Sequence, residues 1–368
     1  MKTALILGGG FAGCTTAYFL KKKGFQVTVI DSGDNPGGGV WTNFYGGHPY
    51  TFGPRVFFSK NDAVISHLKS LIKMRSFITT TWTYVEDDKK LYHYPIQESD
   101  IPLMPDHHVI QSQLDENSKT AVSVENFESY WISTIGQNLY SKFVNNYSKK
   151  MWGIESNKQL TANFEWVNRG TPIRNGDTRL YEDQYQGYPE SLTGFNEYFL
   201  KCIVDVNCRL KTKILYFDPD KRSVFLSTGE SISADIIVNT IHVDTLFDYT
   251  YGPLQYCGRD FLPIWLPIKS ALPDDCTWIH YSGSESHTRV TEFKKITGFQ
   301  SDSTLLGIEV PSSRGRYYPV QSKPEILKFN QYKSLFPINF YSIGRLGKFQ
   351  YQGIPDAIND AIILSNSI

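Results

Sequence analysis

The sequence predicts an α/β protein in which a Rossmann-like dinucleotide-binding domain carries an inserted helical domain and an inserted antiparallel sheet domain. A glycine-rich strand–turn–helix pattern opens the chain, and strand patterns return near residues 236–240 and 340–345. The blocks between these segments carry other patterns, which indicates insertions into one domain rather than a row of separate domains. The 368 residues are 40% hydrophobic and 20% charged, which is typical of folded proteins with about two to three domains.

Charge and cysteine content argue against several classes of function. The chain has 37 basic and 37 acidic residues, whereas proteins that bind nucleic acid or anionic membranes carry a basic excess. Its five cysteines are scattered and include no C-x-x-C pair, so we expect no disulfide framework and no metal site, and we expect a cytoplasmic protein. Three glycines interrupt the first apolar run, and no run approaches the roughly 20 residues of a membrane span, so neither export nor membrane insertion is expected.

The opening segment has the pattern of a dinucleotide-binding β-α-β unit. We expect a buried strand at 3–7, a helix at 14–23 and a second strand at 25–30. The first turn follows G-x-G-x-x-G, whose glycines permit a tight turn, close approach of a pyrophosphate and close packing of helix on strand. An acid at the end of the second strand binds both ribose hydroxyls. The predicted cofactor contacts here are Gly8, Gly10, Phe11, Ala12, Gly13 and Asp31.

Three further segments favour FAD over NAD. A second glycine cluster at 35–42 resembles the conserved extension of FAD-dependent proteins of the two-dinucleotide-binding-domain type. Residues 227–240 resemble their hairpin and returning strand, and residues 340–345, followed by a helical pattern at 355–365, resemble their last FAD contact. An ordinary NAD domain does not need these distant segments. They add Gly38, Gly39, Gly344 and Arg345 to the predicted contacts.

The remaining blocks differ in their residue patterns. The pattern of residues 60–150 predicts mostly helix. Residues 155–195 and 253–330 are rich in β-branched and aromatic residues, which predicts antiparallel strands. We therefore expect a discontinuous FAD-binding domain (1–75, 196–252 and 335–368), a mainly helical substrate and dimer domain (76–155) and an antiparallel β substrate domain (156–195 and 253–334).

Short motifs along nearly the whole chain resemble, in the same order, those of the UDP-galactopyranose mutase family. Among them are Tyr-x-x-Lys-x-Trp-Gly, Pro-x-Arg, Tyr-Gln-Gly-x-Pro and Phe-Asp-Tyr-x-x-Gly-x-Leu-x-Tyr. Each motif alone is weak, but chance rarely places all of them in order on an FAD framework. The matching residues are 147–153, 171–174, 183–189, 247–256, 288–292, 317–320, 344–346 and 351.

The resemblance implies an isomerase that interconverts the pyranose and furanose forms of a nucleotide-linked sugar with no net redox change. It implies that FAD is active when reduced: its N5 attacks the anomeric carbon and expels the nucleoside diphosphate, the sugar ring opens and recloses with five members, and the diphosphate returns. UDP-galactose is the first expectation for the substrate, followed by UDP-N-acetylgalactosamine or a dTDP-linked 6-deoxy sugar. The family precedent also implies a homodimer, reduction by NADPH or a reduced flavin, and supply of furanose, such as galactofuranose, for a surface polysaccharide.

The resemblance also implies roles for individual residues. Arg174 and Arg289 match the family's pyrophosphate clamp and are expected to be catalytic as well as substrate-binding residues, because the forked guanidinium suits the phosphate oxygens of the leaving group. The phosphate-binding hydroxyls match Tyr185, Tyr318 and Tyr351, and the aromatic pair around the base and the sugar entrance matches Tyr147 and Trp152. Each has an ordinary alternative, because an isolated arginine is usually solvated and a buried aromatic residue usually belongs to the core.

The sequence departs from the family beside the flavin and the sugar. Where the family has Gly-x-His-x-x-His, this chain has residues 53–58 without histidine, and the family's arginine after the residue matched by Tyr256 is Cys257. An aspartate late in the last family motif is Gly353. Our hypothesis is that Arg55 supplies the charge missing at Cys257 and takes part in catalysis. The pattern favours a changed sugar over a lost reaction.

Two other functions remain open at this stage. An FAD-dependent oxidoreductase of the amine-oxidase type would use the same cofactor fold, although a diphosphate clamp disfavours it. A nucleotide-sugar binder that has lost its flavin chemistry would explain the missing histidines.

Overall fold

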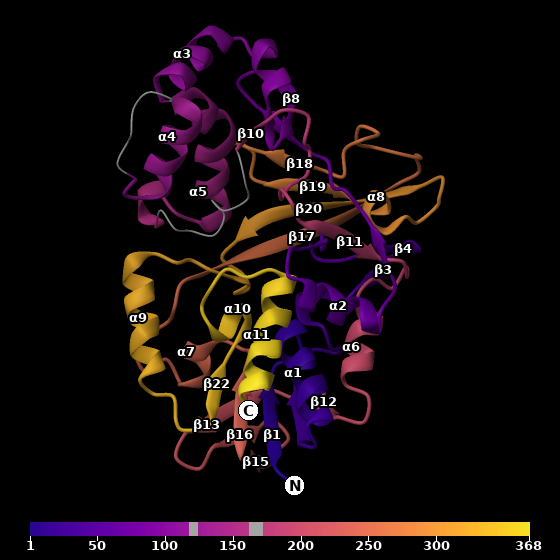
Figure 1. Ribbon diagram of the computed structural model, residues 1–368, viewed down its shortest axis with the longest axis vertical. Helices are drawn as coiled ribbons and strands as arrows, with labels where there is room; N and C mark the ends of the chain where they lie inside the picture. Colours follow the sequence, from indigo (N-terminus) through magenta and orange to yellow (C-terminus); the bar gives the residue numbers. More distant parts are fainter. Residues whose placement is uncertain (118–123, 162–171) are drawn as a thin grey trace.

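The computed structural model describes residues 1–117, 124–161 and 172–368. The lower part of the molecule in Figure 1 is built on a parallel five-stranded sheet in the order β12-β2-β1-β16-β22. One sheet therefore joins the beginning, the middle and the end of the chain, and the two strands predicted for the opening unit are confirmed. In sheet order, the strands are Asn207–Arg209, Gln26–Ile30, Thr3–Leu7, Ile236–Asn239 and Phe340–Ser342.

Both faces of this sheet are covered, because alternate side chains of a strand point to opposite faces. Ala4 and Ile6 of β1 pack with α1 (Phe11–Lys22) and α11 (Ile354–Ser367), which lie side by side in Figure 1. Leu5 of β1 packs on the other face, where the predicted hairpin is confirmed as β14 and β15. The elements of that second cover are β13 (Ile214–Asp218), β14 (Ser223–Leu226), β15 (Ser231–Ser233), α7 (Val243–Leu246) and α9 (Lys323–Lys333).

Two helices follow the predicted patterns with different starting points. Helix α1 begins at Phe11 rather than at Cys14, because the glycine turn leads directly into the first helical turn with Gly10 as N-cap. Helix α2 (Asp62–Leu71) begins after Asn61, whose side-chain oxygen accepts hydrogen bonds from the amides of Ala63 (3.0 Å) and Val64 (3.3 Å). Such a cap satisfies donors that the first helical turn leaves unpaired.

A seven-stranded sheet crosses the upper half of the molecule in the order β21-β17-β20-β19-β18-β7-β8. Its pairs are antiparallel except for β18 with β7, which is parallel. The antiparallel strands expected within 253–330 are thus confirmed. In sheet order, the strands are Tyr318–Pro319, Tyr256–Leu266, Thr304–Ser312, Arg289–Glu292, Trp278–Tyr281, Thr81–Val85 and Lys90–Tyr94.

The hairpin of β7 and β8 corrects the expectation that residues 60–150 are mostly helical. Thr81–Val85 reads Thr-Trp-Thr-Tyr-Val, and its side chains alternate between buried and half-buried. This is the two-residue period of a strand, carried by β-branched and aromatic residues. The hairpin joins the sheet by pairing with β18, nearly 200 residues later along the chain, and that pairing is a tertiary contact.

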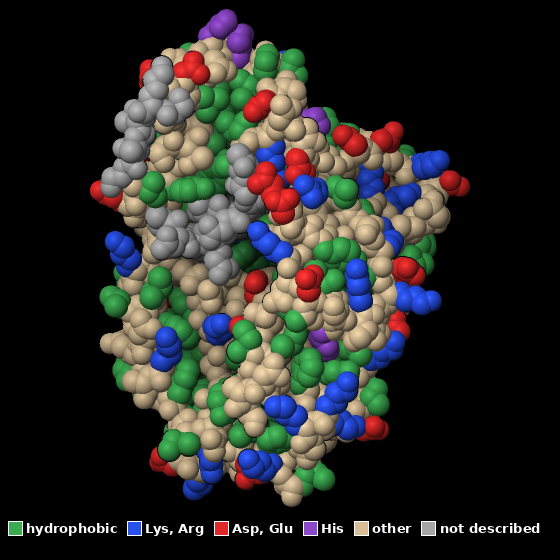
Figure 2. All heavy atoms as spheres, viewed as in Figure 1, with side chains coloured by type: hydrophobic (Ala, Val, Ile, Leu, Met, Phe, Trp, Pro, Cys, Tyr) green, Lys and Arg blue, Asp and Glu red, His purple; other side chains and the backbone are tan. Residues whose placement is uncertain are grey.

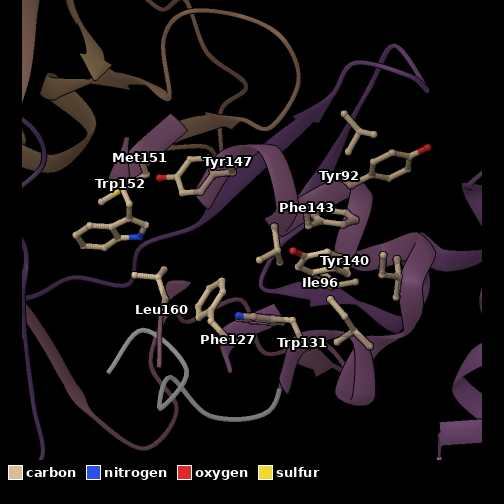
Figure 3. Close-up of a cluster of buried hydrophobic side chains, with 14 of the residues drawn as sticks. Tyr92, Ile96, Phe127, Trp131, Tyr140, Phe143, Tyr147, Met151, Trp152 and Leu160 are labelled. Carbon is tan, nitrogen blue, oxygen red and sulfur yellow. The ribbon is translucent and has the colours of Figure 1, made fainter. Parts of the chain in front are cut away.

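Helices cover one side of the upper sheet (Figure 1). They are α3 (His107–Asn117), α4 (Phe127–Tyr140), a π-helical turn (Ser141–Asn145) and α5 (Asn146–Trp152). A buried cluster joins them to the sheet, with Tyr92 of β8 at one end and Trp152 of α5 at the other (Figure 3).

Three small sheets consist of short strands, which pair as β3–β4, as β5–β11–β6 and as β9–β10. In the described part of the chain, no helix has the length and apolarity to cross a membrane. These strands are β3 (Asn43–Tyr45), β4 (His48–Tyr50), β5 (Phe57–Ser59), β6 (Met74–Ser76), β9 (Ile96–Gln97), β10 (Ile173–Arg174) and β11 (Tyr185–Pro189). The remaining α-helices are α6 (Asn196–Cys202), α8 (Phe293–Thr297) and α10 (Gly344–Gly347).

Candidate active site

The glycine-rich turn after β1 opens a space at the N-terminus of α1. Gly8 has a φ of +102°, which favours glycine. A Cβ added at Gly13 would collide with the Gly8 carbonyl oxygen, whereas a Cβ added at Gly10 would meet no atom within 4 Å. Because glycine has no side chain, Gly13 lets the helix pack on the turn, and Gly10 leaves the helix N-terminus open to an anion.

The second glycine segment borders the same space. The Gly37 amide donates a hydrogen bond to the Gly9 carbonyl oxygen (2.6 Å). A Cβ added at Gly38 would have the Cα of Gly10 as its neighbour at 4.0 Å, and one added at Gly39 would meet no atom within 4 Å. The two backbone segments thus form a cradle, which we define as residues 8–13 and 37–39.

Asp31 lies at the end of β2 beside this cradle. Its carboxylate accepts hydrogen bonds from the amides of Gly9 (2.6 Å) and Gly33 (2.7 Å), one on each oxygen. A carboxylate has about four acceptor sites, so each oxygen keeps a place for a ribose hydroxyl. The open cradle and this acceptor fit a dinucleotide cofactor.

The C-terminal glycine motif packs against the cradle. Gly344 has a φ of +73°, and a Cβ added there would come 2.8 Å from the Cβ of Ala12. Arg345 follows directly, and its guanidinium donates to the Gln352 carbonyl oxygen, with Nε at 2.8 Å. Arg345 therefore reaches from the cradle toward a second group of polar side chains.

That second group is rich in positive charge, and we call it the arginine–tyrosine cluster. Arg289 of β19 and Glu309 of β20 are partners in the antiparallel register, and they form a bidentate ion pair with Nε–Oε1 at 2.6 Å and Nη2–Oε2 at 2.7 Å. Burial of Glu309 favours its neutral form, but the charges of Arg289, Arg259 and Arg55 outweigh it and lower the pKa of the carboxyl. The cluster consists of Arg55, Arg259, Arg289, Glu309, Tyr318, Arg345 and Tyr351.

Tyr318 is the common neighbour in this cluster. Arg55 Nη1 donates to its hydroxyl at 3.5 Å, and the guanidinium carbons of Arg345 and Arg259 lie 4.7 Å and 5.1 Å from its ring centre. Tyr351 stacks beside it, with ring centres 6.1 Å apart and planes at 24°. Arg345 contacts both rings, since its guanidinium carbon lies 5.4 Å from the Tyr351 ring centre.

These cations change the acidity of the Tyr318 phenol. Burial opposes its ionisation, yet the charges of Arg55, Arg345 and Arg259 lower its pKa to about 7, against the opposing charge of Glu309. The site therefore stabilises negative charge at the position of a phenol oxygen, which is what an oxyanion of a phosphate ligand needs.

Helix α5 supplies the aromatic edge of the cluster. Trp152 lies edge-on to Tyr351 (5.7 Å between ring centres) and to Tyr318 (6.4 Å). Tyr147, one and a half turns earlier, lies 5.2 Å from the His280 ring and within electrostatic range of Arg289. Figure 3 shows Tyr147, Met151 and Trp152 together at this end of the buried cluster.

The structure places two of the predicted residues outside the direct contacts of this cluster. Arg174 of β10 is 4% exposed and forms ion pairs with Glu182 (3.6 Å) and Asp177 (3.9 Å). Tyr94 links it to the rest of the site, because Tyr94 lies within electrostatic range of Arg174 and its ring lies 5.3 Å from the His280 ring. His280 is in turn the register partner of Arg289.

Tyr185 of β11 has other neighbours. Its ring packs against Phe57 (6.3 Å between ring centres) and carries the Lys69 ammonium 4.0 Å from its centre. Thr171, which belongs to the same motif as Arg174, lies outside the described residues.

Arg55 reaches the cluster, but Cys257 has a different cation as its neighbour. Cys257 is 7% exposed and pairs with Tyr318 in the register of β17 and β21. Burial raises the pKa of its thiol, and Arg259 opposes this by charge and by a side-chain hydrogen bond. Sequence reasoning missed Arg259 and Glu309; a signal for Arg259 existed, because residues two apart on a strand share a face.

Known proteins are similar to this chain over most of its length. The family model described as "UDP-galactopyranose mutase" matches residues 142–351, and one described as "NAD(P)-binding Rossmann-like domain" matches residues 6–71. A protein of Escherichia coli named "dTDP-fucopyranose mutase" is 26% identical over 98% of this chain and 97% of its own length. One of Klebsiella pneumoniae named "Probable UDP-galactopyranose mutase" is 24% identical over 98% of this chain and 93% of its own length.

Solved structures show the same fold. The crystal structure of a reduced UDP-galactopyranose mutase superimposes with a TM-score of 0.85 at 16% identity, covering 100% of this chain and 95% of the other. A putrescine oxidase with bound putrescine superimposes with a TM-score of 0.63 at 13% identity, covering 100% and 98%. At these identities the likeness concerns the fold alone.

Proposed function

The chain belongs to the UDP-galactopyranose mutase family, and from this premise we propose that it is an isomerase that interconverts the pyranose and furanose forms of a nucleotide-activated sugar without net redox change. The observation that carries the proposal is the position of the arginine–tyrosine cluster. Arg345 touches both Tyr318 and Tyr351 and follows directly on Gly344, which packs against Ala12 of the cradle. Positive charge is thus concentrated at the end of a dinucleotide site.

Cleavage at the anomeric carbon leaves a nucleoside diphosphate with extra negative charge. In the cluster, the guanidinium groups and the Tyr318 hydroxyl are already oriented by hydrogen bonds and an ion pair, so little reorganisation is needed as that charge develops. Arginine also forms paired hydrogen bonds with phosphate oxygens. An oxidase that acts on a small amine has no use for such a group.

We propose FAD as the dinucleotide, held by the residues predicted from the sequence. Bound and reduced, FAD would supply the nucleophile for the anomeric carbon. The chain's own part is to hold the pyrophosphate at the N-terminus of α1, the ribose at Asp31 and the nucleotide sugar on the cluster. The proposed contacts are Gly8, Gly10, Phe11, Ala12, Gly13, Asp31, Gly38, Gly39, Gly344 and Arg345.

We propose that Arg289, Tyr318 and Tyr351 bind the diphosphate, and that Tyr147 and Trp152 border the base and the sugar entrance. The contacts described above support these roles. We also propose that Arg174 and Tyr185 bind the substrate, although they lie outside the direct contacts of the cluster. Arg55 is proposed as a catalytic cation beside Tyr318. For Arg174, binding requires that the diphosphate compete with Glu182 and Asp177.

UDP-galactose and a dTDP-linked 6-deoxy sugar are the first substrates to test. The relatives named for UDP-galactopyranose and dTDP-fucopyranose are similar to this chain at 24% and 26% identity. We propose UDP-galactose first and dTDP-fucose second, with UDP-N-acetylgalactosamine as the third candidate.

The biological setting is part of the proposal. We propose a cytoplasmic homodimer, reduced by NADPH or a reduced flavin, that supplies furanose for a surface polysaccharide. We also propose the predicted domain division for its units, with the FAD-binding domain at 1–75, 196–252 and 335–368, except that α9 of the predicted β domain packs on the parallel sheet and belongs with the FAD-binding domain. The hairpin of β7 and β8 then extends from the helical block (76–155) into the sheet of the β domain.

One experiment tests the function. The FAD-loaded protein is reduced with dithionite and incubated separately with the three nucleotide sugars, and furanose product is measured by chromatography and NMR. Furanose formed only by reduced protein, without loss of reducing equivalents, is the expected result. Reduced protein that forms none, while oxidised protein consumes oxygen with putrescine, would instead support an amine-oxidase-like oxidoreductase.

A further inference from the structure

The arginine–tyrosine cluster has more positive than negative charge. Arg289 is paired with Glu309, but in the described ranges Arg55, Arg259 and Arg345 form no salt bridge with a carboxylate. Their hydrogen bonds go to neutral groups, which are the carbonyl oxygens of Phe52, Gly258, Met151 and Gln352, the Tyr318 hydroxyl (from Arg55) and the Cys257 side chain (from Arg259). Asp356 of α11 lies only within electrostatic range of Arg345.

Such an excess has a physical consequence. Charges that are partly withdrawn from water are costly unless an opposite charge balances them. With Glu309 and Asp356 ionised and Tyr318 neutral, the four guanidiniums still leave an excess of two positive charges. A dianionic ligand balances that excess, and the diphosphate of a nucleotide sugar, a diester with one negative charge on each phosphate, is such a dianion.

Arg259 is well oriented for this ligand. It lies on β17 two residues after Cys257, so the two side chains share a face of the strand. Nη1 donates to the Gly258 carbonyl (2.7 Å) and Nη2 to the Met151 carbonyl (2.9 Å). These bonds fix the guanidinium against the end of α5, 5.1 Å from the Tyr318 ring centre.

We infer that Arg259 is a diphosphate-binding residue of this enzyme and takes the place of the arginine that the family carries at the position of Cys257. Two of its five N–H donors bind backbone carbonyls and one binds the Cys257 side chain, so two remain for phosphate oxygens. Arg55 and Arg345 approach the same phenol from residues far away in the sequence, so the ligand meets cations from three segments of the chain. The inference rests on the proposed function, because it concerns how the same site holds the nucleotide sugar.

The test uses binding to the oxidised FAD-loaded protein, which is independent of turnover. UDP and dTDP are titrated into wild-type protein, Arg259→Gln, Arg259→Lys and the control Arg314→Gln, and dissociation constants are measured by calorimetry at several salt concentrations. Glutamine keeps one amide donor for the Met151 carbonyl but removes the charge. Arg314 is a suitable control, because its side chain is 81% exposed on the neighbouring loop and pairs with Asp260.

We expect Arg259→Gln to weaken binding of the better nucleotide by about tenfold or more, as for loss of a charged hydrogen-bonding group, and to reduce the salt dependence. Arg259→Lys should have an affinity between those of Arg259→Gln and the wild type, since it keeps the charge without the fork, and Arg314→Gln should bind as the wild type does.

Equal binding by Arg259→Gln and wild type would overturn the inference. Wild-type protein that binds neither nucleotide would instead contradict the proposed function. FAD content and thermal unfolding show whether each variant is folded, and if Arg259→Gln does not fold, unchanged binding by Arg259→Lys overturns the inference.

Discussion

Arg289 and Glu309 face each other on adjacent strands and form two charged hydrogen bonds, at 2.6 Å and 2.7 Å. Glu309 is 3% exposed. From the protein interior, it therefore binds the Arg289 guanidinium, which we assign to the diphosphate. The pair is therefore both a structural element and the rigid base of the site.

Glu309→Ala should strongly destabilise the protein. Removal of one partner leaves Arg289 unpaired in a mostly buried place, which costs about 3–5 kcal/mol. The free energy of unfolding is measured by urea titration. Asp260→Ala serves as control, because it breaks an ion pair with the exposed Arg314 side chain, and exposed ion pairs contribute little to stability. Similar losses for the two variants would contradict the assigned role of Glu309.

Nucleoside diphosphate binding should depend on pH through Tyr318. The cations around it lower its pKa to about 7, despite burial and Glu309. Below pH 7 the phenol is neutral and donates to the ligand. Above pH 7 the free protein holds a phenolate, which must take up a proton when the dianion binds, so the affinity should fall by up to about tenfold per pH unit.

Calorimetry at pH 8 in buffers of different ionisation enthalpy measures this proton uptake directly. Tyr318→Phe should abolish the uptake, whereas Tyr216→Phe, on the exposed part of β13, should retain it. Binding at pH 8 without any proton uptake by the wild type would show that Tyr318 is not the titrating group.

Gly10→Val and Gly13→Ala should separate cofactor binding from folding. A side chain at residue 10 meets no protein atom within 4 Å but fills the cradle, so Gly10→Val should fold and lose FAD. A methyl group at residue 13 collides with the Gly8 carbonyl, so Gly13→Ala should destabilise the protein itself. Flavin absorbance and thermal unfolding of the cofactor-free forms are the measurements, and Gly10→Val protein with full FAD content would refute the cradle.

Gly344→Ala should lower FAD content, because its Cβ would lie 2.8 Å from the Cβ of Ala12 and push the C-terminal motif away from the cradle. Gly24→Ala is the matched control. Gly24 also has a left-handed backbone, with a φ of +84°, but its added Cβ meets no atom within 4 Å. Both variants carry backbone strain of about 1–2 kcal/mol, so only the contact with Ala12 distinguishes them. Equal FAD content in the two variants would argue against that contact.

Local residue patterns predicted much of the fold. The β-α-β unit and the hairpin at β14 and β15 both depend on residues close together in sequence, where glycine conformation and strand alternation act. The hairpin at Thr81–Val85 and Lys90–Tyr94 was missed, although its alternating pattern was visible, because its place in the large sheet depends on pairing with Trp278–Tyr281.

The dinucleotide turn, the family motifs and the cysteine in place of the usual arginine at Cys257 can all be recognised in the amino-acid sequence. Which charged groups meet depends on the folded chain: Arg289 pairs with Glu309, and Arg55, Arg259 and Arg345 surround Tyr318. Among the described residues, the contacts given for Arg174 and Tyr185 lie outside this cluster. The reason is physical, because a short-range motif specifies the conformation of its own residues, whereas an electrostatic site depends on the register of strands and the packing of segments that are far apart along the chain.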